Sequence, residues 1–349
     1  MNLSDGALEF YNRKKKTVAQ KTKYFVMKQD SNSLKPWLRA LKYSFLRKSA
    51  EYKAQERTLN ERTISTQNVA FILGCGRSGT TVLGQLFSIH NNVNYFFEPY
   101  HLWSVIDPMT DVLNLYHRIN AKFMMDEADA TEVAKLRFNR IFFSNVMNPK
   151  ENLLLEKTPL NAMRLGYLNS LTPQAKFIHI IRNGVDVSCS IERIALTNSY
   201  KIAGKPNLNQ WWGVENYKWK ALSRDGALAS YYPEEVELCE NHRSKGAYEW
   251  LVSLGEVDRW REQLGDRLYE VTYEQLTVNP ENTLRNLCKF LELGSTKLWF
   301  NQATNMIRPT PPNLRETLSL PPRMCDAFNC YQERFGFANR AIPLENICC

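Results

Sequence analysis

The sequence predicts an α/β fold of three layers, in which a central parallel sheet is flanked by helices on both faces. From about residue 66, short apolar stretches alternate with segments of helical spacing, which is typical of parallel sheets. A glycine-rich turn after the first apolar stretch, and polar residues after the others, indicate where strands end and ligands bind. The 349 residues are enough for one large domain of this kind with an extension.

The chain divides into a basic N-terminal extension, residues 1–65, and a domain that covers residues 66–349. The extension holds fifteen Lys or Arg and six Asp or Glu, whereas the remainder holds thirty of each, so the net charge of +9 belongs to the extension. A nucleic-acid-binding protein would spread positive charge over its folded domain, so we expect no nucleic-acid partner. The asymmetry favours an anionic surface that the extension alone contacts.

Residues 34–49 of the extension have the spacing of a basic amphipathic helix. Its apolar side chains are Leu34, Trp37, Leu38, Leu41 and Phe45, with Lys and Arg on the flanks. Packing of this apolar face on the domain is the commoner arrangement, and attachment to an anionic membrane surface or an anionic acceptor is the alternative. The chain has no membrane-spanning stretch and no secretory signal, so we expect a cytoplasmic protein, with peripheral membrane contact left open.

Five strands are expected in the domain. They cover residues 69–73, 94–97, 153–155, 177–181 and 268–273. Segment 198–248, between the last two, is rich in Trp, Tyr, Gly and Asn. It is predicted to be a lid around a binding cleft or, equally, a loop with peripheral helices. The eight cysteines have neither zinc-type nor CxxC spacing, so we expect reduced thiols.

The first strand leads through a glycine-rich turn into a helix that starts near Gly79. Glycines bring backbone N–H groups close to a phosphate, and the helix N-terminus adds unpaired donors and a favourable dipole. Gly74 and Gly79 have the spacing of a Walker A loop, but Thr80 stands where that loop has lysine, and Arg77 supplies the positive charge. The predicted fold is therefore of the P-loop type. The residues expected to form the anion site are Gly76, Arg77, Ser78, Gly79, Thr80 and Thr81.

This loop resembles the 5'-phosphosulfate loop of the sulfotransferases that use 3'-phosphoadenosine 5'-phosphosulfate (PAPS). In that family an Arg or Lys precedes Ser-Gly-Thr-Thr, as Arg77 precedes residues 78–81 here. The stretch 84–103 resembles the carbohydrate 6-O-sulfotransferases, and the tyrosylprotein sulfotransferases share a Glu at a similar distance. The resemblance implies an enzyme that binds PAPS as co-substrate and transfers its sulfuryl group to a hydroxyl. We expect no metal, because the five histidines lack ligand spacing.

The resemblance also implies which residues bind the rest of the nucleotide. Arg182 follows an apolar strand and Ser190 lies in the next helix, and both match the residues that hold the 3'-phosphate in the family. Tyr273 matches a tyrosine that lies beside the adenine. Arg308 resembles a basic residue that closes over the 3'-phosphate, and Arg315 is its competitor.

The catalytic residues expected from the resemblance are Glu98, Lys157 and Arg77. Glu98 follows the second strand and matches the catalytic Glu that takes the proton of the acceptor hydroxyl, with His101 as a reserve base. Lys157 matches the lysine near the transferred sulfuryl group. Its neighbour Glu156 is expected to be a structural ion-pair partner.

The acceptor is expected to be a carbohydrate, a glycolipid or another small molecule with a hydroxyl group. The arginines that follow the Glu in tyrosylprotein enzymes are not matched by residues 99–101 here. A tyrosylprotein-type enzyme remains an alternative. A P-loop kinase or NTPase, and a non-catalytic membrane-associated protein of the same fold, are further alternatives.

Overall fold

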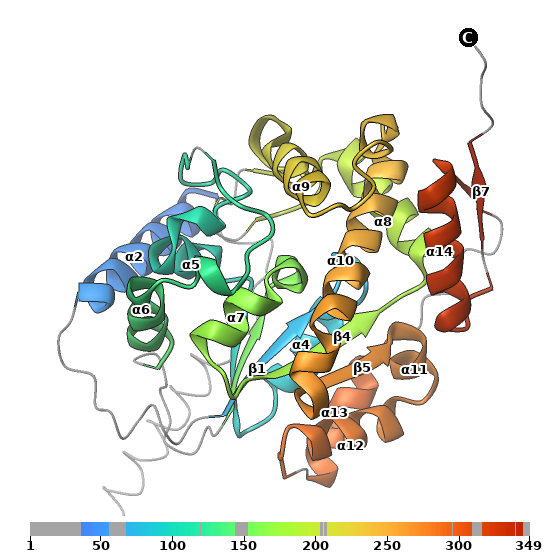
Figure 1. Ribbon diagram of the computed structural model, residues 1–349. Coiled ribbons are helices and arrows are strands. Elements are labelled where there is room, and N and C mark those ends of the chain that lie inside the picture. Colours follow the sequence, from blue (N-terminus) through green and yellow to red (C-terminus); the bar gives the residue numbers. More distant parts are fainter. Residues whose placement is uncertain are drawn as a thin grey trace, which may run out of the picture.

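A five-stranded parallel sheet forms the centre of the protein (Figure 1). Its strands stand in the order β2-β3-β1-β4-β5, and every neighbouring pair is parallel. The computed structural model describes residues 36–55, 68–118, 120–143, 153–202, 205, 208–294, 296–308, 316–338 and 340–344. Within these residues the predicted α/β fold with a flanked parallel sheet is confirmed.

The five strands lie where the sequence predicts them, within two residues at each end. They are β1 (Asn68–Leu73), β2 (Val93–Phe97), β3 (Leu153–Lys157), β4 (Lys176–Ile181) and β5 (Leu268–Thr272). A further two-stranded parallel sheet, which the sequence did not predict, pairs β6 (Leu318–Leu320) with β7 (Ala341–Pro343).

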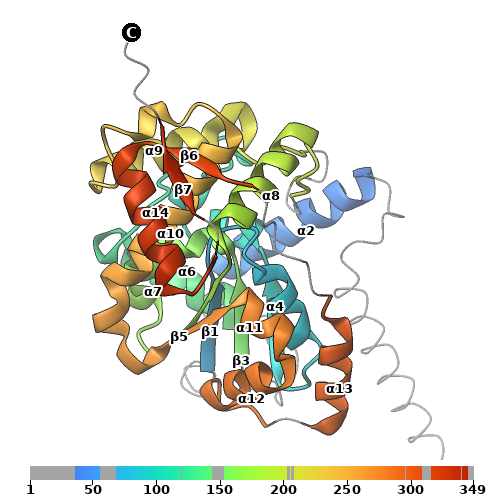
Figure 2. The same cartoon turned by 90° about the vertical axis from the view of Figure 1, so that its right-hand side faces the viewer.

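Helices cover both faces of the central sheet, as Figures 1 and 2 show. Side chains alternate along β1, so that Phe71 enters one apolar cluster and Ile72 the other. The first cluster holds α5 (Tyr100–Ile106), α6 (Glu132–Phe143), α7 (Leu165–Leu171), α8 (Gly184–Thr197), α9 (Tyr217–Leu228), α10 (His242–Leu264) and α14 (Pro322–Arg334). The second holds α4 (Thr80–Ser88), α11 (Tyr273–Val278), α12 (Pro280–Phe290) and α13 (Lys297–Met306).

Helix α2 (Pro36–Gln55) packs beside α5 and α6, but not through the face that the sequence pattern suggested. Tyr43 and Ala50 are the buried side chains of α2. Trp37 and Phe45, in contrast, are 56% and 72% exposed. The expectation that the apolar face of residues 34–49 packs on the domain is therefore wrong for its described part, because the opposite face of the helix makes the contact. Leu34 lies outside the described residues.

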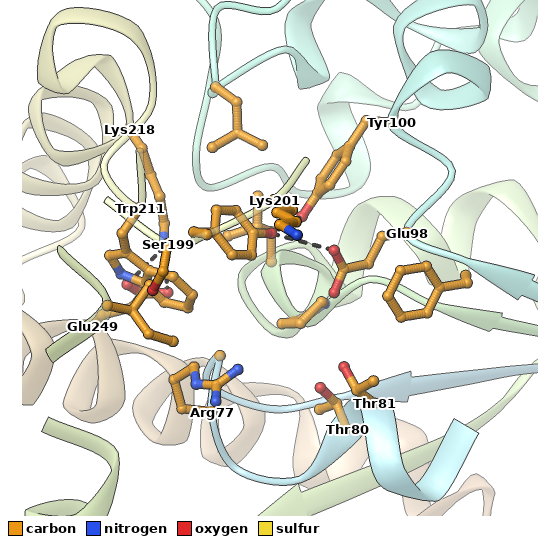
Figure 3. A pocket seen from close by; sticks show the side chains of 17 residues that line it. Arg77, Thr80, Thr81, Glu98, Tyr100, Ser199, Lys201, Trp211, Lys218 and Glu249 are labelled. Carbon is orange, nitrogen blue, oxygen red and sulfur yellow. Dashed lines mark hydrogen bonds and ion pairs between the residues drawn. The ribbon is translucent and has the colours of Figure 1, made fainter. Parts of the chain in front are cut away.

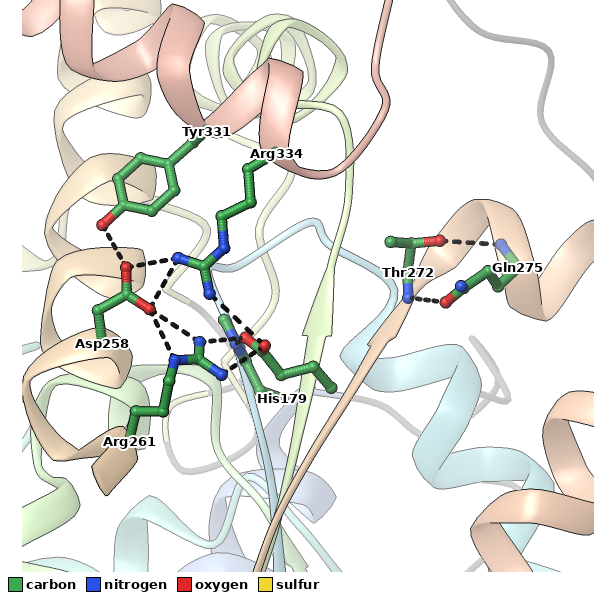
Figure 4. A network of polar contacts seen from close by, with 8 residues as sticks. His179, Asp258, Arg261, Thr272, Gln275, Tyr331 and Arg334 are labelled. Carbon is green, nitrogen blue, oxygen red and sulfur yellow. Dashed lines mark hydrogen bonds and ion pairs between the residues drawn. The ribbon is translucent and has the colours of Figure 1, made fainter. Parts of the chain in front are cut away.

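A polar network joins the sheet to α10 and α14 on the first face (Figure 4). Both carboxylate oxygens of Glu270 in β5 accept a hydrogen bond from Arg261 of α10. One of them also contacts Nδ1 of His179 on β4. Asp258 of α10 accepts from Arg261 and from Arg334 of α14. These charge-assisted bonds tie the C-terminal helix to the edge of the sheet.

All five strands end at one edge of the sheet, because they run in parallel. The strand order reverses on either side of β1, and such a switch point is where open α/β sheets bind ligands. The residues that directly follow or complete these strands are those that the sequence predicted for the site.

Candidate active site

The turn between β1 and α4 has the geometry of an anion-binding loop. Three of its residues have positive φ angles, namely Gly74 at 141°, Arg77 at 77° and Gly79 at 98°. Gly79 is the N-cap of α4 and no side chain caps this helix, so the first N–H groups of α4 are available to an anion. Ser78 is 1% exposed and its hydroxyl has no hydrogen-bond partner among the described residues. The loop therefore fits a phosphate-type group.

Arg77 connects this loop to the residues predicted for the 3'-phosphate. Its Nε donates a hydrogen bond to Oγ of Ser190 at 3.1 Å, although 113 residues separate the two. Arg182 donates to the backbone oxygen of Arg77 at 3.5 Å and forms an ion pair with Asp186. Two guanidinium groups and a hydroxyl thus lie together beside the loop, which suits a second anionic group of one ligand.

Tyr273 closes the other side of the loop. A Cβ atom built on Gly79 would lie 2.5 Å from the Tyr273 ring, so only glycine allows this close approach. The guanidinium of Arg182 lies 4.8 Å from the centre of the same ring. The Tyr273 hydroxyl donates to the backbone oxygen of Arg308, whose own side chain is exposed and donates to Asn305. Arg315, the competitor of Arg308, lies outside the described residues.

Glu98 occupies the turn after β2 with a left-handed backbone, at φ 39°. Such a conformation is strained for a residue other than glycine, and strain of this kind concentrates at functional sites. Its carboxylate is buried and accepts hydrogen bonds from Nζ of Lys157 at 2.5 Å and from the hydroxyl of Tyr200 at 3.2 Å. The carboxylate is therefore held by two donors from different segments.

Lys157 joins Glu98 to the anion loop. It is fully buried at the end of β3, and its ammonium group donates to Oγ1 of Thr81 at 2.9 Å as well as to Glu98. Burial lowers the pKa of Lys157, while the neighbouring carboxylate of Glu98 opposes that shift. Thr81, Lys157 and Glu98, all predicted for the site, are thus linked by hydrogen bonds, and Thr81 and Glu98 line one cavity.

The cavity has a volume of about 260 Å³ and lies between the loop and segment 198–218 (Figure 3). Arg77, Thr80 and Thr81 lie along one side of it, and Glu98 and Tyr100 on another. Residues that the sequence did not single out also line the cavity, among them Leu113, Ser199, Tyr200, Lys201, Trp211, Lys218 and Glu249. Segment 198–248 therefore contributes a wall of the cavity, as a lid would, and also carries the peripheral helix α9.

Trp211 packs directly against the anion loop. A Cβ atom built on Gly76 would lie 2.5 Å from Cη2 of the Trp211 ring. A side chain at position 76 would collide with this indole, so the loop and the wall from segment 198–218 depend on the same contact.

Two residues near Glu98 differ from their expected roles. His101, the reserve base, is buried against Tyr43 of α2 and does not line the cavity. Burial lowers the pKa of His101 to about 4. Glu156 forms no ion pair in the described structure. Instead it accepts hydrogen bonds from Trp103, Thr158 and Asn161, and burial raises its pKa to about 7.

No group of three or more His, Cys, Asp or Glu side chains could hold a metal ion in the part of the chain that the structure describes. The expectation of metal-free chemistry stays a prediction. No helix in the same part is long and apolar enough to cross a membrane.

The fold and the cavity define an α/β protein in which a glycine-rich loop lies beside a buried carboxylate and a buried lysine. A model of the sulfotransferase family matches residues 70–218, which contain the loop, Glu98, Lys157 and Arg182. This part of the chain is similar to the sulfotransferase family, in agreement with the resemblance seen in the sequence.

Known relatives are distant. The chain is 25% identical over 227 residues to protein-tyrosine sulfotransferase 1 of Danio rerio, a match that covers 64% of this chain and 52% of that protein. It is 26% identical over 129 residues to the nodulation protein NoeE of Sinorhizobium fredii, covering 36% and 31%. The chain thus spans about half or less of these curated relatives. Among solved structures, the sulfotransferase domain of the Synechococcus PCC 7002 olefin synthase is 18% identical with a TM-score of 0.41, covering 78% of this chain and 96% of that one.

Proposed function

We propose that the protein is a sulfotransferase that moves the sulfuryl group of PAPS to a hydroxyl of a carbohydrate, a glycolipid or another small molecule. The observation that carries the proposal is the link from Thr81 through Lys157 to Glu98. It joins an anion loop to a carboxylate within one cavity, and transfer between a phosphosulfate and a hydroxyl needs both.

The nucleotide is bound by two groups of residues. The loop of residues 76–81 holds the 5'-phosphosulfate through its backbone N–H groups and Arg77. Arg182 and Ser190 hold the 3'-phosphate, Tyr273 lies beside the adenine, and Arg308 closes over the nucleotide from the C-terminal side. The hydrogen bond between Arg77 and Ser190 supports this division, because it keeps the two groups adjacent.

Transfer proceeds in line. Glu98 takes the proton of the acceptor hydroxyl while the hydroxyl oxygen bonds to sulfur and the bond from sulfur to the 5'-phosphate oxygen breaks. Lys157, Arg77 and the loop N–H groups stabilise the negative charge that develops on the departing phosphate oxygen. Each oxygen of Glu98 accepts one hydrogen bond in the described structure and has capacity for another, so the acceptor hydroxyl can join without displacing Lys157 or Tyr200. The products are a sulfate ester and adenosine 3',5'-bisphosphate.

Two measurements test this proposal. Adenosine 3',5'-bisphosphate should raise the melting temperature of the protein, whereas ATP with magnesium should not. Labelled sulfate should pass from PAPS to at least one compound in a panel of glycans, lipids and phenols. Stabilisation by ATP with magnesium alone would favour a kinase or NTPase, and nucleotide binding without any transfer would favour a non-catalytic protein.

A tyrosylprotein-type enzyme is the second candidate, because a protein-tyrosine sulfotransferase is among the relatives. Tyrosine-containing peptides therefore belong in the acceptor panel. If sulfate is transferred to these peptides faster than to every glycan and lipid, the acceptor is a protein tyrosine and not a carbohydrate, a glycolipid or another small molecule.

We also propose that α2 contacts an anionic membrane surface from the cytoplasmic side. Its exposed apolar residues are Trp37, Leu38, Leu41, Phe45 and Tyr52. They share one face of the helix, and α2 carries five basic residues against one acidic residue. Aromatic and aliphatic side chains beside Lys and Arg are complementary to an interface of anionic lipids.

Sedimentation of the full chain with phosphatidylserine vesicles tests the membrane contact. Phe45→Ser should weaken vesicle binding, while Leu228→Ser, which changes an exposed leucine of α9, should not. Equal binding by both variants would contradict the contact. A dimer that Phe45→Ser dissociates would assign the face to a second copy of the chain.

A further inference from the structure

An ion pair is buried in the wall of the cavity on the side away from Glu98 (Figure 3). Nζ of Lys218 in α9 lies 2.8 Å from both carboxylate oxygens of Glu249 in α10. The side chains are only 4% and 1% exposed. Neither residue has a part in the proposed transfer, and a buried pair of this kind is seldom needed for stability, since apolar residues of similar volume often replace it without loss.

The indole of Trp211, beside the ion pair, carries a buried donor that no described residue uses. Trp211 is 5% exposed and lines the cavity, and its Nε1 has no hydrogen-bond partner among the described residues. A buried N–H without a partner costs free energy, which a ligand oxygen would recover. Lys218 lies 4.1 Å from the centre of the indole ring, so the ion pair and the indole form one cluster.

This cluster presents both kinds of hydrogen-bonding group. Trp211 can donate, and each oxygen of Glu249 accepts one bond from Lys218 and keeps capacity for another. A hydroxyl group donates and accepts at once, so it satisfies an indole N–H and a carboxylate oxygen together. A thioether or hydrocarbon satisfies neither.

We propose that Trp211, Lys218 and Glu249 form a subsite for a second hydroxyl of the acceptor, so that the acceptor is a polyhydroxylated compound such as a sugar ring. The proposal rests on the proposed sulfotransferase function and narrows its acceptor class. A phenol or a simple alcohol fills the position next to Glu98 but leaves the subsite empty. The enzyme should therefore prefer a polyhydroxylated acceptor to a phenol, because a site with buried polar groups rejects an analogue that leaves them unpaired.

Acceptor competition tests the subsite. Trp211→Phe removes the N–H and keeps an aromatic ring, so the ratio of kcat/KM for a methyl glycoside to kcat/KM for a simple phenol should fall about tenfold. Trp212→Phe is the matched control, because the Trp212 indole donates to His242 and does not line the cavity. In Trp212→Phe the ratio of the two kcat/KM values should equal that of the unmodified protein. An unchanged ratio in Trp211→Phe would overturn the proposal.

A second variant addresses the ion pair, because removal of one charge alone would leave the other buried. Lys218→Met combined with Glu249→Gln removes both charges at similar volume. Binding of adenosine 3',5'-bisphosphate should persist and show that the fold is intact, while the acceptor ratio falls. A ratio equal to that of the natural chain, with nucleotide still bound, would contradict the role of the pair.

Calorimetry separates failure of the subsite from failure of the proposed reaction. The methyl glycoside should bind the natural chain loaded with adenosine 3',5'-bisphosphate more tightly than it binds Trp211→Phe, whether or not sulfate is ever transferred. If no acceptor is sulfated but this difference appears, the proposed reaction is wrong and the polyol subsite stands. If sulfate is transferred but the glycoside binds both proteins equally, the subsite is wrong.

Discussion

The ammonium group of Lys157 donates to Oε1 of Glu98 at 2.5 Å, and both groups are buried at the carboxyl edge of the sheet. The pair couples the end of β3 to the turn after β2. The carboxylate that we propose takes the acceptor proton therefore lies beside the cation that we propose stabilises the leaving phosphate, so the two proposed catalytic functions depend on one contact.

Glu98→Gln is expected to lower turnover by at least about a hundredfold, because an amide cannot take the acceptor proton. Transfer of labelled sulfate measures this, and calorimetry should show that adenosine 3',5'-bisphosphate still binds. Glu156→Gln serves as the control, since Glu156 is also buried but does not line the cavity. Turnover by Glu98→Gln at the level of this control would remove Glu98 from the mechanism.

Tyr200→Phe is expected to lower kcat several-fold, because the Tyr200 hydroxyl donates to Oε2 of Glu98 and holds the carboxylate in place. Burial raises the pKa of Tyr200 well above its usual value, so the phenol stays a donor at neutral pH. The control is Tyr100→Phe, since Tyr100 contacts Tyr200 but makes no hydrogen bond to Glu98 in the described structure. A larger loss of kcat in Tyr100→Phe would contradict the positioning role of Tyr200.

Stability should fall as the pH rises from about 4.5 to about 7, because of Glu156. Burial raises the pKa of Glu156 to about 7 in the folded protein, from an ordinary value of 4.5. The unfolded chain therefore loses this proton first, which costs on the order of 3 kcal/mol of folding free energy across that range. Urea unfolding of Glu156→Gln at several pH values should lack this slope. If the unfolding free energy of Glu156→Gln changes with pH as steeply as that of the unmodified protein, other titrating groups cause the pH dependence.

The opposite pH dependence is expected from Glu270. Burial opposes its ionisation, but hydrogen bonds from His179 and Arg261 outweigh burial and lower the pKa of Glu270 to about 2. The stabilisation is complete above pH 4.5 and is lost as the pH falls towards 2. Glu270→Gln should therefore be less stable at pH 7 and lose less stability on acidification, as measured by thermal unfolding. Parallel acid profiles of the two proteins would refute this account.

The sequence predicted the sheet and the positions of Arg77, Glu98, Lys157 and Arg182, because each follows or ends an apolar strand and parallel strands end at one edge. It could not predict the Lys218–Glu249 pair, since the two residues lie on separate helices and their contact depends on how α9 packs against α10. The sequence pattern also predicted the wrong face of α2 for the contact with the domain. Spacing places Trp37 and Phe45 on one side of the helix, but does not say whether the domain covers that side.

The contact between Gly76 and Trp211 limits how the protein can be redesigned. Libraries that vary the acceptor wall at position 211 alone will retain the loop, since a smaller residue there only opens space. Libraries that vary position 76 alone will force the Trp211 indole to move, because a Cβ atom at that position would lie 2.5 Å from the ring. Changes to the loop at position 76 therefore need a smaller side chain at position 211, so the two positions are best varied together.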